Sequence, residues 1–161
     1  MAQFFAAIDS QGALLGGWTL SSVVQIRSGI PVNLVTGRDN FGDGFPATQR
    51  PKYLGGSIYA ANQSISSWFN TAAFANPPAG TFGNLGYDIA NGPISVIINT
   101  GLTRQFTLYK EHSLLFRVDA FNLPNRANFL NPDGNINSAT FGRITSADNP
   151  RQVQMSLRYR F

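Results

Sequence analysis

The chain has 161 residues, a formal net charge of +4 and 12% charged residues, about half the usual share for a soluble domain, while Gly (16), Pro (9) and Phe (13) are frequent. With no cysteine and one histidine, it lacks the residues for a disulfide scaffold, a thiolate or multi-histidine metal centre, or a cysteine nucleophile. No apolar run reaches the roughly 18 residues of a membrane-spanning helix and most basic residues stand alone, so we expect a β-rich protein without a nucleic-acid partner.

The first predicted element is a strand near residues 17–36. Every second residue from Trp18 to Leu34 is mostly apolar, and the residues between them are mostly polar or small. This period of two is that of a β-strand whose two faces meet different surroundings. We expect Gly29 and Pro31 to bend the strand or to form a bulge.

A long loop is predicted at residues 37–92, and connections of this length are usually functional or disordered. Its aromatic residues Trp68, Phe69 and Phe74 are candidates for a surface that binds a ligand or a partner. The alternative, which we favour, is that they pack the loop against itself or against the barrel rim, because a loop of this length needs a small core of its own. The segment 64–74 also fits a short helix, with Trp68 and Phe74 on similar sides.

Asp39 and Asp43, beside Gly42 and Gly44, are the candidates for a cation site in this loop. Their spacing does not match the EF-hand loop, and the glutamate that ends that loop is missing. Aspartate next to glycine is also the usual composition of a tight turn. We therefore favour a turn over a metal site and expect no cofactor.

Three further strands are predicted near residues 94–108, 112–122 and 151–161, with a short turn between the first two and a second long loop at 123–149. Each shows the same alternation of apolar and polar residues. The alternation is clearest at the C-terminus, whose apolar positions are Val153, Met155, Leu157, Tyr159 and Phe161.

Two groups of polar residues near these strands are expected to be structural. His112 lies in the short turn, and no nucleophile or catalytic signature accompanies it, so we expect no enzymatic activity. Asn122, Asn125 and Asn128 are expected to satisfy backbone groups where the chain leaves the sheet.

The predicted fold class is all-β: an antiparallel, up-and-down segment of a transmembrane β-barrel, with about four strands and long outer loops. Outer-membrane barrels have strands of about ten residues, with short turns at one end of the barrel and long loops at the other. The predicted elements show the same asymmetry. The apolar face of each strand would meet lipid, and the polar face would meet a hydrated lumen.

The arginines of the predicted strands obey this division with one exception. Those on the polar face are Arg27, Arg117, Arg158 and Arg160. There a carboxylate such as Asp119 is available to them, whereas each would cost about 2–4 kcal/mol on the lipid face at mid-bilayer. The exception is Arg104, in the apolar phase, whose side chain we expect to snorkel to the membrane interface.

Four segments together carry a resemblance to a known family. They read GGWTLSSVVQIRSGIPV at residues 16–32, WFNTAAFANPPAGTFGNLG at 68–86, FRVDAFNLPNRANF at 116–129 and FGRITSADNPRQVQMSLRYRF at 141–161. In this combination and order, the chain resembles the C-terminal part of a TonB-dependent outer-membrane receptor of the Oar-like type. The resemblance implies that the protein lies in the bacterial outer membrane and takes up a nutrient such as a siderophore or an oligosaccharide. It also implies that Phe161 is the aromatic signal that the barrel-assembly machinery reads.

The resemblance also implies a larger molecule, a barrel of about 22 strands with a plug domain. About four strands are predicted here, and the smallest known barrels have about eight. We therefore expect residues 1–161 to be a C-terminal fragment without the plug domain and the signal peptide, with Met1 as an internal start. Its expected partners are outer-membrane lipid, the remaining barrel strands and the plug, and the isolated chain is expected to fold poorly.

Two other interpretations stay open. The chain could be a soluble or extracellular all-β binding module whose site is the loop with Trp68, Phe69 and Phe74. It could also contribute four strands per subunit to a barrel built from several chains. Membrane fractionation distinguishes the soluble binding module from the receptor. The mass of the protein in mild detergent distinguishes the multi-chain barrel from the receptor.

Overall fold

The computed structural model describes residues 2–8 and 16–161, with only the backbone described in residues 2–8; the proposed start at Met1 lies outside them. The chain divides into two compact units, which we describe separately. The sheet unit comprises Met1–Arg27, Ser95–Asn128 and Asn149–Phe161, and the loop unit comprises Ser28–Ile94 and Phe129–Asp148. No helix in the described part of the chain has the length and apolar character needed to cross a membrane.

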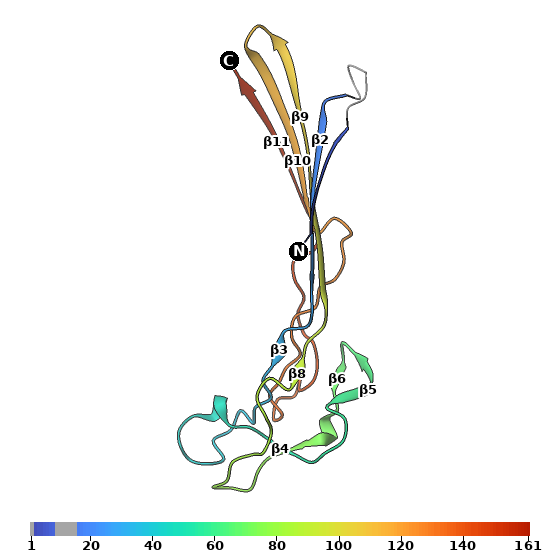
Figure 1. The fold of residues 1–161 in the computed structure, drawn as a ribbon. Helices are drawn as coiled ribbons and strands as arrows, with labels where there is room; N and C mark the ends of the chain where they lie inside the picture. Colours follow the sequence, from blue (N-terminus) through green and yellow to red (C-terminus); the bar gives the residue numbers. More distant parts are fainter. Residues whose placement is uncertain (1, 9–15) are drawn as a thin grey trace. The chain divides into compact units, whose positions relative to one another are not determined.

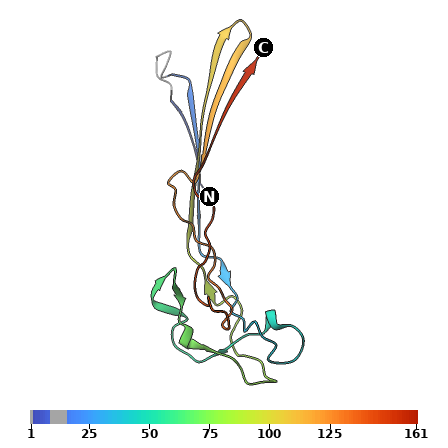
Figure 2. The same cartoon turned by 180° about the vertical axis from the view of Figure 1, so that it is seen from behind.

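The sheet unit is one antiparallel sheet of five strands in the order β1-β2-β9-β10-β11 (Figures 1 and 2). Each strand of this unit therefore pairs with the strand of the unit that comes next along the chain. The strands are β1 (Ala2–Ile8), β2 (Trp18–Arg27), β9 (Ser95–Tyr109), β10 (His112–Phe121) and β11 (Gln152–Arg160). The all-β, up-and-down prediction is confirmed. The prediction missed β1, because the apolar residues in AQFFAAI are consecutive and do not alternate with polar ones.

The register keeps the two faces of this sheet distinct. On one face, Leu20, Leu102, Val118 and Met155 form a row across four strands. The next row, on the other face, consists of Ser21, Gly101, Asp119 and Gln154. A slip of one residue would move every apolar side chain of a strand to the polar face, so this register follows from the alternation in the sequence.

Arg104 lies among aromatic side chains on the apolar face. Its Cα pairs with those of Trp18 and Phe116, and its side chain is only 8% exposed. The guanidinium carbon lies 4.5 Å from the ring centroid of Phe106 and 5.4 Å from that of Trp18. Aromatic faces therefore cover and stabilise the cation where it stands, and the snorkelling of Arg104 to the membrane interface stays a prediction.

On the polar face, Arg117 and Asp119 form the ion pair that the sequence suggested. The guanidinium donates to both carboxylate oxygens, at 2.6 and 2.9 Å. Gly101 lies beside this pair, and a Cβ there would be 2.8 Å from the nearer Asp119 oxygen and 3.0 Å from the Ser21 hydroxyl. A glycine thus leaves room for the charged pair between two strands.

The asparagines after β10 bond to the backbone as predicted. The Asn122 side chain bonds to the N–H and C=O of Arg126. The side-chain oxygen of Asn125 accepts from the backbone N–H of Arg151, and that of Asn128 accepts from the backbone N–H of Val96. These bonds replace ladder hydrogen bonds where the chain leaves the sheet.

The loop unit contains three small two-stranded sheets. They pair β3 (Pro31–Val32) with β8 (Ala90–Asn91), β4 (Lys52–Tyr53) with β7 (Phe74–Ala75), and β5 (Tyr59–Ser64) with β6 (Ser67–Phe69). Two short 3-10 turns, Pro46–Thr48 and Thr71–Ala73, complete the unit. Its hydrophobic core consists of Val32, Leu34, Phe69, Ala73, Phe74, Leu85 and Ala90. The predicted loop at 37–92 is therefore folded.

The strand predicted at 17–36 is shorter than expected and ends at Arg27. A Cβ at Gly29 would lie 1.8 Å from the carbonyl oxygen of Gly92, so the backbones approach each other more closely than two side chains permit. Pro31, which has no N–H, then begins the separate strand β3. The predicted interruption at Gly29 and Pro31 is a full break between strands.

The helix predicted at 64–74 is wrong. This segment forms the β5–β6 hairpin followed by the 3-10 turn, whose first residues are capped by Asn70. The hairpin gains backbone hydrogen bonds that a helix would lose, from Trp68 N–H to Gly142 and from Ile144 N–H to Ile65. Pairing with a distant segment therefore outweighs the local pattern.

Candidate functional site

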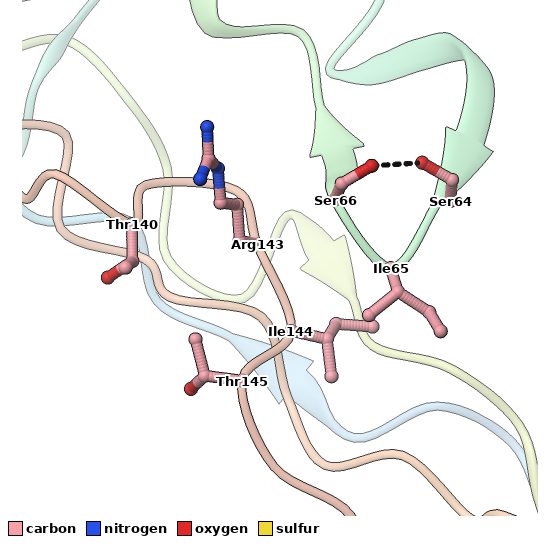
Figure 3. A pocket seen from close by; sticks show the side chains of 7 residues that line it. All are labelled: Ser64, Ile65, Ser66, Thr140, Arg143, Ile144 and Thr145. Carbon is pink, nitrogen blue, oxygen red and sulfur yellow. Dashed lines mark hydrogen bonds between the residues drawn. The ribbon is translucent and has the colours of Figure 1, made fainter.

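A cavity of about 610 Å³ opens in the loop unit between the β5–β6 turn and the segment 140–145 (Figure 3). It is lined by Ser64, Ile65, Ser66, Thr140, Arg143, Ile144 and Thr145. It is a shallow surface pocket that is largely open to solvent. Ile65 gives it an exposed apolar side chain, and Arg143 is the one charged residue among the described residues that line it.

The backbone on both sides of Arg143 is held firmly. The Trp68 N–H donates to Gly142 at 2.7 Å, and the Ile144 N–H donates to Ile65 at 2.8 Å. The N–H of Arg143 donates to Thr140 and its C=O accepts from Asp133, both at 2.9 Å. The side chain of Arg143 projects from this backbone. In Figure 3 it points away from Ile65 and Ile144.

A second cavity, of about 360 Å³, shares Ser66 and Arg143 with the first. It is lined by Ser66, Ser67, Phe69, Thr71, Ile136, Ser138, Ala139, Phe141 and Arg143. Four of these residues carry hydroxyl groups, as do four of those that line the first cavity. Arg143 therefore stands at the junction of the two cavities.

The acidic residue nearest to this junction in the hydrogen-bond network is Asp133, and it is already engaged. It accepts from the Thr140 hydroxyl at 2.6 Å and from the Asn135 N–H at 2.9 Å. Burial raises the pKa of Asp133, but hydrogen bonds from Ser138, Thr140 and Asn135 outweigh burial and lower this pKa below its ordinary value. Asp133 is thus a carboxylate that fixes Thr140, and it lines neither cavity.

The three aromatic candidates have different positions. Phe69 and Phe74 are 1% and 7% exposed and belong to the core of the loop unit. Trp68 is half-buried, and its indole N–H donates to the carbonyl oxygen of Asn91 at 2.9 Å. The structure thus places two of the three rings where they pack the unit, which is the arrangement that the sequence favoured over a binding surface.

Asp39 and Asp43 meet in one loop, with the Gln49 amide between them. Gln49 donates to Asp39 at 2.6 Å and to Asp43 at 2.9 Å, and Asp39 also accepts from the N–H groups of Gly42 and Gly44. These bonds, first that from Gly44 and then that from Gln49, lower the pKa of Asp39. No cluster of three or more metal-ligating side chains occurs within residues 2–8 and 16–161.

The Asp39 loop predicts a pH effect. Because its pKa is lower in the folded loop, this carboxylate stabilises the loop fully above the ordinary value of 3.8, and that contribution is lost as the pH falls through the lower, folded value. We expect pepsin to cut at Phe41 and Phe45 progressively faster between about pH 4 and pH 2. The Asp39→Asn variant is the control, because it has no carboxylate to titrate. Equal pH profiles for the two proteins would contradict the role of Asp39.

Sequence reasoning missed Arg143 and its surroundings. The two lining segments, 64–66 and 140–145, lie far apart in the chain, and a lone arginine after a glycine gives no motif. It also missed the stacked pair of Phe41 and Phe82, whose ring centroids are 4.0 Å apart. The proposed assembly residue Phe161 follows β11 directly and is 91% exposed.

A family model described as "Outer membrane beta barrel domain" matches residues 3–154, nearly the whole chain. No curated protein and no solved structure matched the chain.

Proposed function

The chain belongs to the outer membrane beta barrel domain family, and from this we propose that it supplies wall strands and outer loops to a TonB-dependent receptor for nutrient uptake, without catalysis. Its place in an outer-membrane barrel wall follows from the family and from the sheet. The observation that supports the barrel wall most directly is the register, which gathers most of the apolar residues of β2, β9, β10 and β11 on one face. The receptor assignment draws on the four segments that resemble such receptors.

The edges of the sheet agree with a larger barrel. Among the described strands, none pairs with the outer edge of β1 or with that of β11. Lipid does not tolerate an unpaired strand edge, because backbone N–H and C=O groups there have no water to bond to. We propose that further strands of the receptor pair with both edges, that its plug fills the lumen, and that the barrel-assembly machinery reads Phe161. A barrel shared by several four-strand chains is the alternative, and the mass in mild detergent distinguishes it.

The proposal fixes a topology that can be tested by labelling. If Phe161 marks the periplasmic end, the turn at Lys110 and Glu111 is periplasmic, and the loops at 37–92 and 123–149 are extracellular. The chain has no cysteine, so single cysteines report unambiguously on its position. We expect Asn62→Cys to react with a membrane-impermeant maleimide on intact cells. Glu111→Cys should react only after the outer membrane is permeabilised, and the reverse pattern would overturn the topology.

The TonB dependence needs its own experiment. We expect the complete gene product to be retained by the immobilised periplasmic domain of TonB and to require TonB for the uptake of its nutrient. An outer-membrane porin is the control for retention. A protein that assembles in the outer membrane but is not retained would leave the barrel assignment intact and contradict the receptor assignment.

A further inference from the structure

We propose that the free edge of β11 pairs with a strand that carries carboxylates opposite Arg158 and Arg160, so that cross-strand ion pairs join this strand to the sheet. The inference rests on the barrel wall in the proposed function, and it names the chemistry of one neighbour that the wall needs. It makes no use of TonB or of a nutrient, so it can fail while the receptor assignment stands.

The polar face of β11 changes character along the strand. It begins with the uncharged side chains of Gln152, Gln154 and Ser156 and ends with Arg158 and Arg160. Both arginines are exposed, and no carboxylate of the described residues lies within 4 Å of either guanidinium. Successive residues on one face of a strand are about 7 Å apart, so the two cations repel each other. This end of the face therefore calls for anions.

The neighbouring strand β10 does not supply these anions. The residues of β10 that pair with the two arginines are Leu115 and Ser113, and neither is acidic. The one acidic residue of β10 is Asp119, and both of its carboxylate oxygens already accept from Arg117. The anions therefore belong on the other side of β11, with which no described strand pairs.

A strand outside residues 1–161 is the carrier that this edge favours. An edge in lipid has to be covered by another strand, because its backbone groups have no water to bond to. Opposite residues of antiparallel strands have Cβ atoms about 4.5–5.5 Å apart, within reach of an ion pair. A second copy of this chain does not fit, because neither edge strand, β1 (AQFFAAI) nor β11 (QVQMSLRYR), contains an acidic residue.

Lysine variants convert the ion pairs into covalent bonds that can be mapped. A water-soluble carbodiimide joins a lysine amine to a carboxylate in contact with it, and it does not join a guanidinium. In outer-membrane fractions that carry the full protein, we expect Arg158→Lys and Arg160→Lys each to give a new cross-linked peptide that the wild type lacks. Because neighbouring strands run antiparallel, position 160 should join an acidic residue two places before the one that position 158 joins. Mass spectrometry of the digested protein identifies both residues.

Gln154→Lys is the positive control, because position 154 pairs with Asp119 and should be cross-linked to it. Both test variants keep the positive charge, so the wall assembles with the wild-type charge. The proposal is overturned if either variant gives no new cross-link, if both join the same carboxylate, or if the carboxylates lie in the plug, in a loop or in a second copy. Absent cross-links in a protein that TonB retains would count against the ion pairs alone, and mapped cross-links in a protein that TonB does not retain would count against the receptor assignment alone.

Discussion

Replacing Met155 by arginine is expected to block assembly of the barrel, whereas the same replacement at the adjacent residue Gln154 should be tolerated. Met155 lies near the middle of β11, opposite Val118, and is 72% exposed on the apolar face. An arginine on the lipid face near the bilayer midplane costs about 2–4 kcal/mol. The free energy of unfolding of the assembled protein should fall by that amount.

Gln154→Arg is a close control because it introduces the same side chain one position away in the same strand. Gln154 pairs with Asp119 on the polar face, where a new cation finds a carboxylate and water. The measurements are the heat-dependent shift of the protein in gel electrophoresis of outer-membrane fractions and the urea midpoint in detergent. Equal assembly of both variants would show that the apolar face does not meet lipid, and failure of Gln154→Arg alone would show that the faces are reversed.

The sheet was predictable because its signal is local. A strand that separates lipid from a lumen must alternate along its own length, so β2, β9, β10 and β11 could each be recognised without knowing their neighbours. The covering of Arg104 by Trp18 depends on which residue of β2 stands next to it, and the register decides that. The pattern of β9 alone places Arg104 and Phe106 on the same face, but it does not reveal that Trp18 also lies against the guanidinium.

The loop unit was predictable only in outline. The sequence indicated a small aromatic core at Phe69 and Phe74, but its local pattern favoured a helix where the chain forms a hairpin. The hairpin exists because residues 142–144 pair with it, and nothing near residue 65 indicates a partner so far away in the chain. The Arg143 cavities arise from the same long-range pairing, which is why no motif pointed to them.

Replacing Phe69 by alanine is expected to unfold the loop unit and leave the sheet unit assembled. Phe69 is 1% exposed, and its ring centroid lies 6.2 Å from those of Tyr59 and Phe141. A Cβ added at Gly142 would lie 3.4 Å from the backbone N and the Cβ of Phe69. Removing a buried phenylalanine ring costs about 3–5 kcal/mol. That is a large fraction of the stability of a small folded unit, so protease resistance of the loops should be lost.

Phe82→Ala is the matched control, because this ring is 61% exposed and stacks only on Phe41 among the described residues. Its loss should cost no more than about 1.5 kcal/mol and leave the loops resistant. The gel shift of the outer-membrane fraction should be unchanged in both variants, since Phe69 and Phe82 lie outside the sheet unit. If the loops of the Phe69→Ala variant stay protease-resistant, this ring does not support the loop unit. That result would also contradict the explanation that the aromatic residues at 68–74 pack the unit. Loss of the barrel in the same variant would mean instead that the two units do not fold independently.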